Sequence, residues 1–362
     1  MSANPDTYAS FLTAEADPSL AARRRREKLG ELVVLGGTAV VLGALLAIPA
    51  FLIVSIVPWT PLAGEAWAGL GVLLAGTVKA AVCALLVGLP LGLGAAIFSA
   101  QFAAPGFRAW FKPALEILEA IPTVVLGLIA FATVSPWLKT NVATLLALLV
   151  IVPSALLAAG MGLGAGLRRR EGWLPLWILP ALLIVVAATI ALGDASRTPW
   201  IVPASPWNAV LVGLALGLAA VPLVFSIAED ALMLVPAAHA RAALALGASR
   251  WQALASIVLP AARPGLFAAL GLGASRCLGE TMIVLMASGN TPLATVDPLA
   301  GLRTISAELA IGLPEAAPPG SAYRTLLLSA LVLFALTFAL NLVAERARTK
   351  LRRRAAAAAT IA

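Results

Sequence analysis

Charged residues and the side chains of most catalytic centres are scarce in this sequence. Only 12% of its 362 residues are Asp, Glu, Lys or Arg, and it contains one histidine and two cysteines. Cys83 and Cys277 both stand inside apolar stretches, with no CxxC pattern and no histidine nearby. We therefore expect neither a metal site nor a disulfide, and interpret both cysteines as small core side chains.

Motifs for nucleotide binding and hydrolysis are also missing. The sequence has no GxxxxGK[ST] loop, so we do not expect it to bind ATP. It has no HExxH or GxSxG pattern, and its one histidine, His239, lies in a hydrophilic stretch. These absences argue against an intramembrane enzyme, and we expect no catalytic residue and no cofactor.

Hydrophobic residues dominate instead, at 61% with a mean hydropathy of +0.99. A soluble domain has an apolar fraction of about half, so the sequence predicts an all-α, polytopic membrane protein. A helix of about 20 apolar residues crosses the hydrocarbon core of a bilayer. Eight runs qualify: 31–57, 68–99, 114–135, 143–165, 173–193, 208–228, 264–288 and 325–344.

Basic residues gather just outside these runs, at 23–28, 168–170 and 346–354. Because Lys and Arg are enriched in cytoplasmic loops, this pattern places both termini and the stretch 229–263 in the cytoplasm. We interpret the net charge of +8 as this topology signal. Contact with membrane lipid is expected, and contact with nucleic acid is not.

The stretch 229–263 interrupts the apolar pattern. It is rich in alanine, which favours helix, and Gly247 permits a break, while Pro260 is expected to end a second short helix. The sequence thus predicts two short helices joined by a turn outside the bilayer. An amphipathic helix lying on the lipid surface, with Arg241 and Trp251 among its anchors, is the alternative. The apolar side chains here are mostly small, which favours a protein cleft.

Two charged residues stand within the apolar run 264–288. Arg276 and Glu280 are four residues apart, so one helix would place them on the same face, where they can neutralise each other. A charge deep in a bilayer costs about 3 kcal/mol unless it is paired or hydrated. The two residues are therefore either a structural ion pair or part of an anion pathway, in which the guanidinium fork binds a tetrahedral oxyanion. Thr281 could add a hydroxyl donor.

Acidic residues also stand near the start of the run 114–135. We expect Glu116 and Glu119 in the first turn of that helix, where they would complement its dipole, before a break at Pro122. Lys79 is interpreted as a side chain that reaches the outer membrane interface along its own stem.

Four motifs in order resemble one transporter family. The pattern Arg241-Ala242-Ala243-x3-Gly247-x9-Ile257-x-Leu259-Pro260 resembles the EAA loop of type I ABC-transporter permeases. The run Leu278-Gly279-Glu280-Thr281-Met282, followed by Gly289-Asn290, resembles the signature of phosphate permease subunits of the PstC type. The segments 113–125 and 225–232 match the same subfamily. The family usually has Glu where this chain has Arg241.

The resemblance implies a MetI-like helical bundle in the cell inner membrane that imports inorganic phosphate by alternating access, driven by ATP hydrolysis on a separate subunit. It implies a second homologous permease, two cytoplasmic ATPase subunits and an extracytoplasmic phosphate-binding protein as partners. The loop would dock on the ATPase, and Arg276, Glu280 and Thr281 would line the phosphate pathway. An importer of another oxyanion, such as sulfate, molybdate or phosphonate, and a membrane regulator that reports phosphate status are the alternatives.

The domain organisation follows from these assignments. We expect a cytoplasmic tail, an extra N-terminal helix with an outer loop, a permease domain and a basic cytoplasmic tail, at 1–30, 31–67, 68–345 and 346–362. The permease domain would contain an inserted hairpin at 143–193 and the cytoplasmic coupling loop at 229–263.

Overall fold

The structure is a computed structural model, and it describes residues 18–56, 64–139, 205–318 and 320–361. The chain divides into two units, residues 1–59 and 60–362. The described residues of the first unit form helix α2 (Pro18–Ile56), of which Arg26–Ile56 is long and apolar enough to cross a membrane. The predicted first span is therefore confirmed, but the helix begins well before residue 31 and includes the basic residues that precede the apolar run.

The second unit is helical throughout its described ranges, apart from loops and one isolated bridge between Gly289 and Leu302. Its elements are α3 (Gly64–Gln101), α4 (Pro105–Glu119), α5 (Thr123–Ile129), the π-turn η1 (Ala130–Val134), α8 (Ala209–Met233), α9 (Ala237–Ala245), α10 (Arg250–Ala253), the π-turn η3 (Leu254–Val258), α11 (Leu259–Gly279), α12 (Met282–Ala287), α13 (Ile305–Glu315) and α14 (Ser321–Ile361).

The centre of this unit is the contact between α3 and α8. Glycines let the two backbones approach closely: a Cβ atom built on Gly88 would lie 2.6 Å from the Gly217 carbonyl oxygen, and one on Gly217 would lie 2.7 Å from the Ala84 carbonyl oxygen. Small residues at a helix interface are typical of membrane bundles, where packing rather than water exclusion drives association. Most of the α8 residues are buried, so α8 is the core of the unit.

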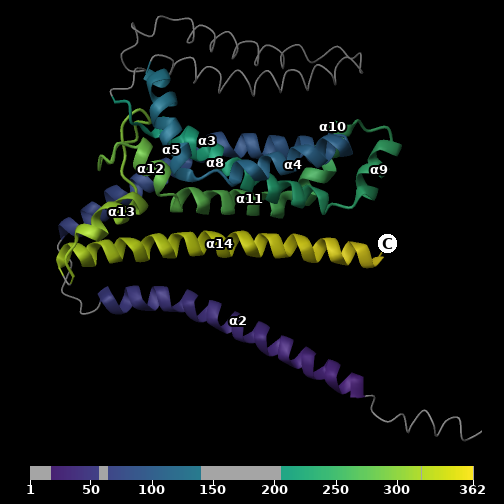
Figure 1. The fold of residues 1–362 in the computed structure, drawn as a ribbon. Helices are drawn as coiled ribbons and strands as arrows, with labels where there is room; N and C mark the ends of the chain where they lie inside the picture. Colours follow the sequence, from purple (N-terminus) through teal and green to yellow (C-terminus); the bar gives the residue numbers. More distant parts are fainter. Residues whose placement is uncertain (1–17, 57–63, 140–204, 319, 362) are drawn as a thin grey trace, which may run out of the picture. The chain divides into compact units, whose positions relative to one another are not determined.

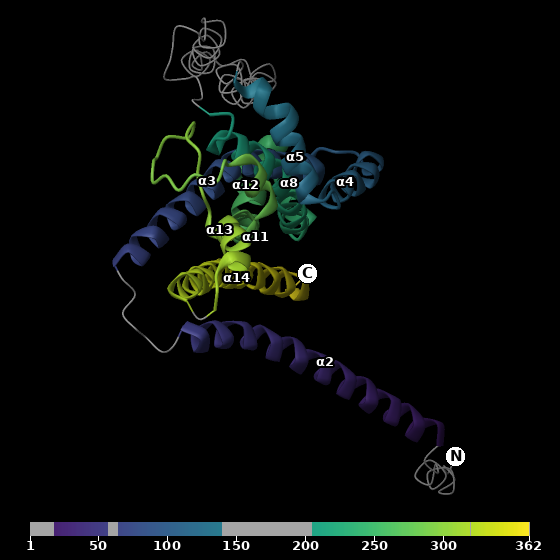
Figure 2. The same ribbon diagram turned by 60° about the vertical axis from the view of Figure 1, so that its left-hand side comes forward.

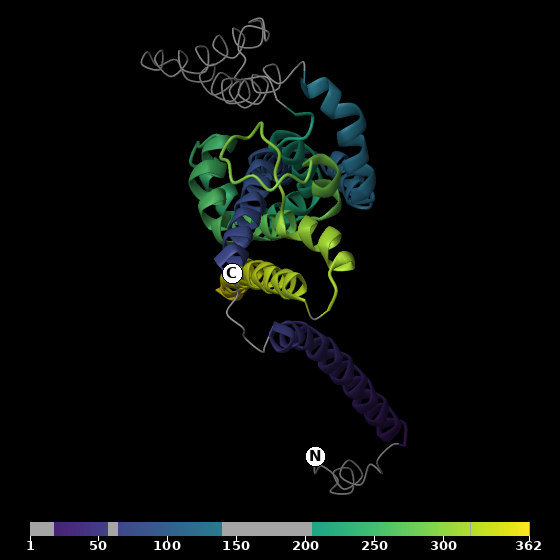
Figure 3. The ribbon, with the colours of Figure 1, turned by 90° about the vertical axis from the view of Figure 1, so that its left-hand side faces the viewer.

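Helix α11 packs on α8, α3 and α14, and Figure 1 shows α8, α11 and α14 running side by side. Buried side chains of α8 and α11, among them Phe225, Ala228 and Ala262, form one of two apolar clusters in the described core. Figure 2 shows α13 lying against α14. A Cβ atom built on Gly312 of α13 would lie 3.2 Å from the Leu326 side chain of α14. In Figure 3 the yellow-green segment after α12 passes over α3. The two segments are in contact where the Arg303 carbonyl oxygen lies against Gly76 of α3.

Five described helices could cross a membrane by length and composition, and a sixth candidate is the bent pair Gly106–Glu119 and Thr123–Lys139. The predicted spans at 68–99 and 208–228 are confirmed by Trp67–Gln101 and Ala209–Met233. The predicted hairpin at 143–193 lies outside the described residues.

The predicted span 114–135 is wrong in its beginning. Helix α4 already begins at Pro105, so the segment expected as an inner loop is helical, and Glu116 and Glu119 occupy the last turn of α4 instead of the first turn of a span. The first acidic residue of an apolar run is therefore not a reliable mark of the helix start here. The amphipathic stretch before it, which begins with a proline at the first helical position, gives the true start.

The predicted end of the second loop helix at Pro260 is also wrong. The helix continues from Arg250 through the π-turn η3 and Pro260 to Gly279. Proline lacks an N–H and its ring displaces the carbonyl one turn earlier. The wide turn directly before Pro260, closed by the Leu259 N–H on the Leu254 carbonyl, accommodates this defect, so the helix continues through the proline.

Two further boundaries differ from expectation. The last helix does not end at residue 344, because α14 continues through the basic residues to Ile361. The outer segment after α12 contains a helix, α13, that was not predicted from the sequence. Its start is capped by the Thr304 hydroxyl, which accepts a hydrogen bond from the Ala307 N–H.

Candidate functional site

A sharp break separates α4 from α5. The two helices meet at an angle of 85°. The break follows from local chemistry: Pro122 lacks an N–H, and a proline disfavours the helical conformation of the residue before it, Ile121. The Ala120 N–H donates to carbonyls of the last turn of α4, those of Ile117 and Leu118, and α5 begins directly after Pro122. The break therefore confirms the prediction made for Pro122.

A second break separates α11 from α12, at Glu280 and Thr281. Glu280 has an extended backbone, with φ −71° and ψ 128°, and the helical pattern resumes only at Met282. The predicted continuous span 264–288 is therefore wrong. The freed Glu280 carbonyl accepts a hydrogen bond from the Ser306 hydroxyl at 2.8 Å, which offsets the loss of a helical partner.

The second break is held by the start of α13. Ser306 lies in the first turn of α13, and the neighbouring Ile305 N–H donates to the Thr77 hydroxyl of α3 at 3.0 Å. Thr77 is buried and donates in turn to the Leu73 carbonyl. The start of α13 thus joins the opened backbone at Glu280 to the central helix α3.

The two breaks lie next to each other, because α5 packs on α12. Gly127 of α5 is buried against α12, where a Cβ atom would lie 3.2 Å from the Ile283 Cα.

At the other end of α12, Gly289 (φ +71°) and Asn290 (φ +49°) adopt the left-handed conformation, which glycine and asparagine tolerate best. This turn brings the chain back toward α13.

The side chains at the breaks form an ion pair that joins the two broken elements. Arg276 Nη1 lies 2.9 Å from Glu119 Oε1, and the two side chains are 29% and 39% exposed. The expected neutralisation of Arg276 by Glu280 is wrong: because the helix ends at Gly279, these two side chains do not continue along one helical face, and no ion pair between them occurs in the described ranges. Glu119, not Glu280, is the partner of Arg276.

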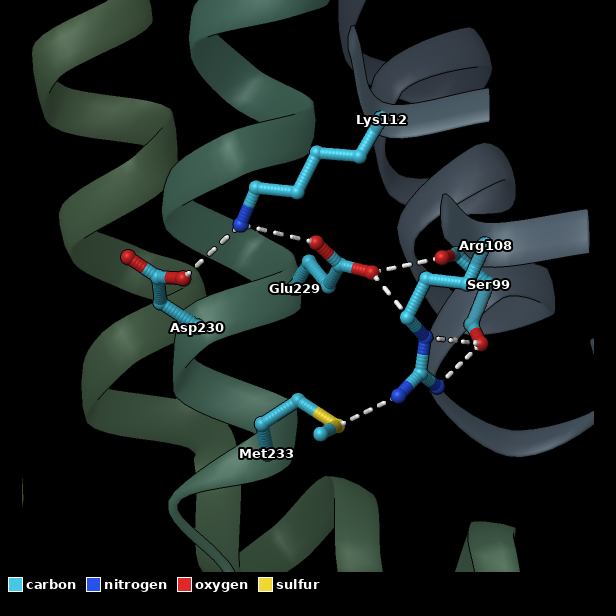
Figure 4. A network of polar contacts seen from close by, with 6 residues as sticks. All are labelled: Ser99, Arg108, Lys112, Glu229, Asp230 and Met233. Atoms are coloured by element: carbon cyan, nitrogen blue, oxygen red, sulfur yellow. Dashed lines mark hydrogen bonds and ion pairs between the residues drawn. The ribbon is translucent and has the colours of Figure 1, made fainter. Parts of the chain in front are cut away.

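A network of ion pairs and hydrogen bonds joins α4 to the C-terminal end of α8 (Figure 4). The Glu229 side chain, 3% exposed, accepts a hydrogen bond from the Ser99 hydroxyl at 2.5 Å and lies 3.5 Å from Arg108 Nε and 3.2 Å from Lys112 Nζ. Lys112 also pairs with Asp230 at 3.6 Å. Arg108 and Lys112 belong to α4, Ser99 to α3, and both acids to α8, so the network fixes α4 on the central pair.

The predicted turn at Gly247 is confirmed, and the helix before it, α9, is short as expected, whereas the helix after it is the start of the long helix Arg250–Gly279. Gly247, with φ +85°, follows α9, and its N–H donates to the Leu244 carbonyl while the Ala248 N–H donates to the Ala243 carbonyl. This pair of bonds is the Schellman motif, which needs a residue with positive φ. Ser249 then begins α10 with a capping box, in which its hydroxyl accepts from the Gln252 N–H and its own N–H donates to the Gln252 side chain.

The loop presents one face to the core and one to the outside. Leu254, Val258, Ala243 and Ala253 are buried, and the first two pack in the same apolar cluster as Phe225 of α8. The opposite face leaves large apolar side chains exposed, with Leu246 at 90% and Trp251 at 54%. This face of the loop is therefore uncovered in the single chain.

The structure distributes the candidate residues over two places. Arg276, Glu280 and Thr281 lie at the α11 break and are half-buried. Of the loop residues, Arg241, Ala242 and Gly247 are exposed, Ala243 is buried, and Ile257, Leu259 and Pro260 are half-buried in the continued helix.

The roles of Glu119 and of Arg108 with Lys112 were not predicted from the sequence. No local signal marked Glu119 as the partner of Arg276, because the two residues are 157 positions apart. The amphipathic pattern of 105–119 was the signal that Arg108 and Lys112 face a common partner on a helix.

Comparisons with known proteins give a consistent result. The family described as binding-protein-dependent transport system inner membrane component matches residues 88–356. The chain is 27% identical to the phosphate transport system permease protein PstC of Mesorhizobium japonicum, over 87% of this chain and 84% of that protein. It is also 27% identical to the proteins of that name from Mycobacterium leprae, over 74% and 72%, and Xylella fastidiosa, over 77% and 73%.

Proposed function

Because the chain belongs to the family of inner membrane components of binding-protein-dependent transport systems, we propose that it is the permease subunit of an ATP-driven importer of inorganic phosphate. The family assignment makes it a multi-pass inner membrane protein that works with an ATPase and a substrate-binding protein. Phosphate as the substrate is supported by similarity to phosphate permeases over most of the chain.

The observation that carries the proposal is the position of Arg276. About 16 residues of helix separate it from Pro260, which corresponds to about 24 Å along the axis, or most of the hydrocarbon core. There it stands beside two helix breaks and remains 29% exposed in the single chain. Non-helical backbone at membrane depth is tolerated only inside protein or beside a water-filled cavity. The breaks and the guanidinium therefore support an aqueous anion pathway at this point.

We infer the roles of the site residues from this arrangement. Arg276 contacts the phosphate oxygens through its N–H donors, which suit a tetrahedral oxyanion. Glu280 shapes the break through its extended backbone, and Thr281 offers a hydroxyl beside it. A second, homologous permease packs over this partly exposed site and completes the channel.

The loop 229–263 is proposed as the docking element for the ATPase. Its exposed apolar face, including Leu246 and Trp251, fits a protein cleft better than water. Its second helix is continuous with α11, so displacement at α10 is transmitted along one helix to Arg276. Closure of two ATPase subunits on ATP would thereby switch the cavity from outward to inward, after an extracytoplasmic phosphate-binding protein has delivered its ligand.

The decisive experiment is phosphate uptake in cells that lack their own high-affinity importer. The cells receive this chain with its neighbouring transporter genes, as wild type, Arg276→Gln or Arg346→Gln, at matched membrane abundance. Arg346 is exposed in the C-terminal half of α14, so its variant makes the same chemical change away from both sites. We expect uptake to be lost only in Arg276→Gln, with the complex intact.

Each other result has a definite meaning. Normal uptake in Arg276→Gln would remove Arg276 from the pathway and leave its pair with Glu119 a structural contact. No phosphate uptake in wild type, with uptake of sulfate, molybdate or phosphonate in its place, would reject the substrate.

A further inference from the structure

We propose that Glu119 is a displaceable counter-ion of Arg276, which competes with the transported oxyanion for the guanidinium and so limits how tightly the pathway holds its substrate. This inference rests on the proposed role of Arg276. It assigns a function to a residue that belongs to neither the loop nor the signature run.

The contact between the two residues is a single one. The hydrogen bond from Arg276 Nη1 to Glu119 Oε1, at 2.9 Å, is the one that the side chain of Arg276 makes among the described residues. A guanidinium has several N–H donors in a fixed fork and holds a carboxylate most firmly through two parallel bonds. A single contact between side chains that are 29% and 39% exposed leaves donors available to an incoming anion.

The position of Glu119 in α4 gives the carboxylate no other stabilising partner. It is the last residue of the helix, where the helix dipole places partial negative charge and disfavours an acid. Its side chain makes no second ion pair in the described part of the chain. The contact with Arg276 therefore holds the Glu119 carboxylate in place. A carboxylate at this end of α4 does not stabilise the helix itself.

Charge makes the two occupants mutually exclusive. With Glu119 in contact, the positive charge of Arg276 is balanced, so the site does not attract an anion strongly. A carboxylate and an oxyanion on the same guanidinium lie close together with little water between them, so their like charges repel each other. An arriving oxyanion must therefore displace Glu119, and the return of Glu119 helps to expel it.

The location of the pair allows this exchange. Glu119 directly precedes the break at Ala120–Pro122, and Arg276 precedes the break at Glu280, so each partner stands at the end of a helix. A change in the angle between α4 and α5, or between α11 and α12, would separate the two side chains without unfolding a turn. Movement of α11 by the docked ATPase is one source of such a change.

The test is the binding of inorganic phosphate to the purified complete transporter in lipid nanodiscs, without ATP and without the binding protein. Wild type, Glu119→Gln, Glu116→Gln and Arg276→Gln are compared by titration with radioactive phosphate. Glu116 is the matched control, because it lies one turn earlier on α4, is exposed and makes no ion pair with a described residue. The Glu116→Gln substitution removes the same negative charge as Glu119→Gln.

We expect Glu119→Gln to bind phosphate about five- to tenfold more tightly than wild type, since a partly exposed ion pair that must be broken is worth about 1 kcal/mol. Glu116→Gln should bind like wild type, and Arg276→Gln should lose binding. Glu119→Asp, which keeps the charge, should stay close to wild type. A role in structure alone could weaken binding in Glu119→Gln but would not strengthen it.

The outcomes separate the two proposals. Unchanged or weaker binding in Glu119→Gln, with binding lost in Arg276→Gln, would overturn the counter-ion and leave Arg276 in the pathway. If Glu116→Gln also binds phosphate more tightly, the tighter binding comes from the lower negative charge of the protein in general. That result would also overturn the counter-ion proposal. Wild-type binding in Arg276→Gln, or no binding to any variant at millimolar phosphate, would reject the pathway role of Arg276 and the counter-ion with it.

Discussion

At the scale of single residues, the buried carboxylate of Glu229 shows how a charge is held inside this bundle. Its environment supplies a hydroxyl from Ser99 and two cations, Arg108 and Lys112, from α4. Those cations are 27% and 36% exposed, so water shares in their solvation. A buried carboxylate is tolerated only when its oxygens are paired in this way.

The first prediction concerns this carboxylate. Glu229→Leu leaves Ser99 and the nearby cations without their acceptor, and we expect the complex to lose about 1–3 kcal/mol of stability. The midpoint of thermal unfolding of the detergent-solubilised transporter measures it. Asp230→Asn is the control, because that side chain is 55% exposed and, among the described residues, forms an ion pair with Lys112 alone, at 3.6 Å. Equal shifts in both variants would contradict the network.

The second prediction concerns Gly247. Its φ is +85° and no heavy atom lies within 4 Å of the position that a Cβ atom would take, so its constraint is conformational rather than steric. Gly247→Ala should therefore cost about 1–2 kcal/mol at the turn between α9 and α10 and reduce the ATPase that co-purifies with the permease. Asparagine adopts a positive φ more readily than alanine, so the Gly247→Asn variant should retain the ATPase. Equal retention by Ala and Asn would show that the turn does not shape the docking surface.

At the scale of elements, the close approach of α3 and α8 sets the positions of the remaining helices. Gly88 and Gly217 face each other across it, and Gly213 packs against Cys83, where a Cβ atom would lie 2.7 Å from the Cys83 Cβ. The Glu229 network binds α4 to the C-terminal ends of α3 and α8, and the ion pair between Glu119 and Arg276 binds α4 to α11. Helix α8 is thereby connected to the two breaks through α4 as well as through α11.

The third prediction tests the α3–α8 interface. Gly88→Ala places a methyl group 2.6 Å from the Gly217 carbonyl oxygen, so the helices must separate, and we expect a loss of about 1–3 kcal/mol. Gly94→Ala, on the same helix, meets no heavy atom within 4 Å and should be neutral or stabilising because alanine favours helix. Thermal unfolding of both variants gives the comparison, and a neutral Gly88→Ala would disprove the tight contact.

At the scale of the whole molecule, two surfaces of the chain are those proposed above for contact with other subunits. The partly exposed Arg276 lies on one such surface, and the exposed apolar side chains of the loop form another. Arg241 stands exposed on the second, at the place where the resembling family has an acid. A basic residue at a docking surface calls for an acidic partner, since like charges across an interface are unfavourable.

The fourth prediction follows from that charge. Arg241→Glu should weaken assembly with the chain's own ATPase, measured as the amount of ATPase retained on the affinity-purified permease at low and high salt. The defect should be largest at low salt, where charges are least screened. Arg241→Gln should have a smaller effect, because it removes attraction without adding repulsion. Assembly unaffected by Arg241→Glu would show that no acidic residue faces this position.

The sequence by itself determined the class of protein. An apolar fraction of 61%, with long uncharged runs, leaves membrane helices as the solution, because backbone groups in lipid must be satisfied within the segment. The break at Pro122 and the turn at Gly247 were also readable, since a missing N–H and a positive φ are local properties. The motif order was sufficient to indicate the family.

Only the tertiary structure decided which charges meet. The spacing of Arg276 and Glu280 predicts a pair on a continuous helix, but the backbone opens at Glu280, where the hydroxyl of Ser306, 26 positions later, donates the hydrogen bond that the helix no longer supplies. Glu119, 157 positions before Arg276, then becomes its partner. Contacts between residues this far apart depend on how α3, α8 and α11 pack, and no local pattern in the sequence encodes that packing.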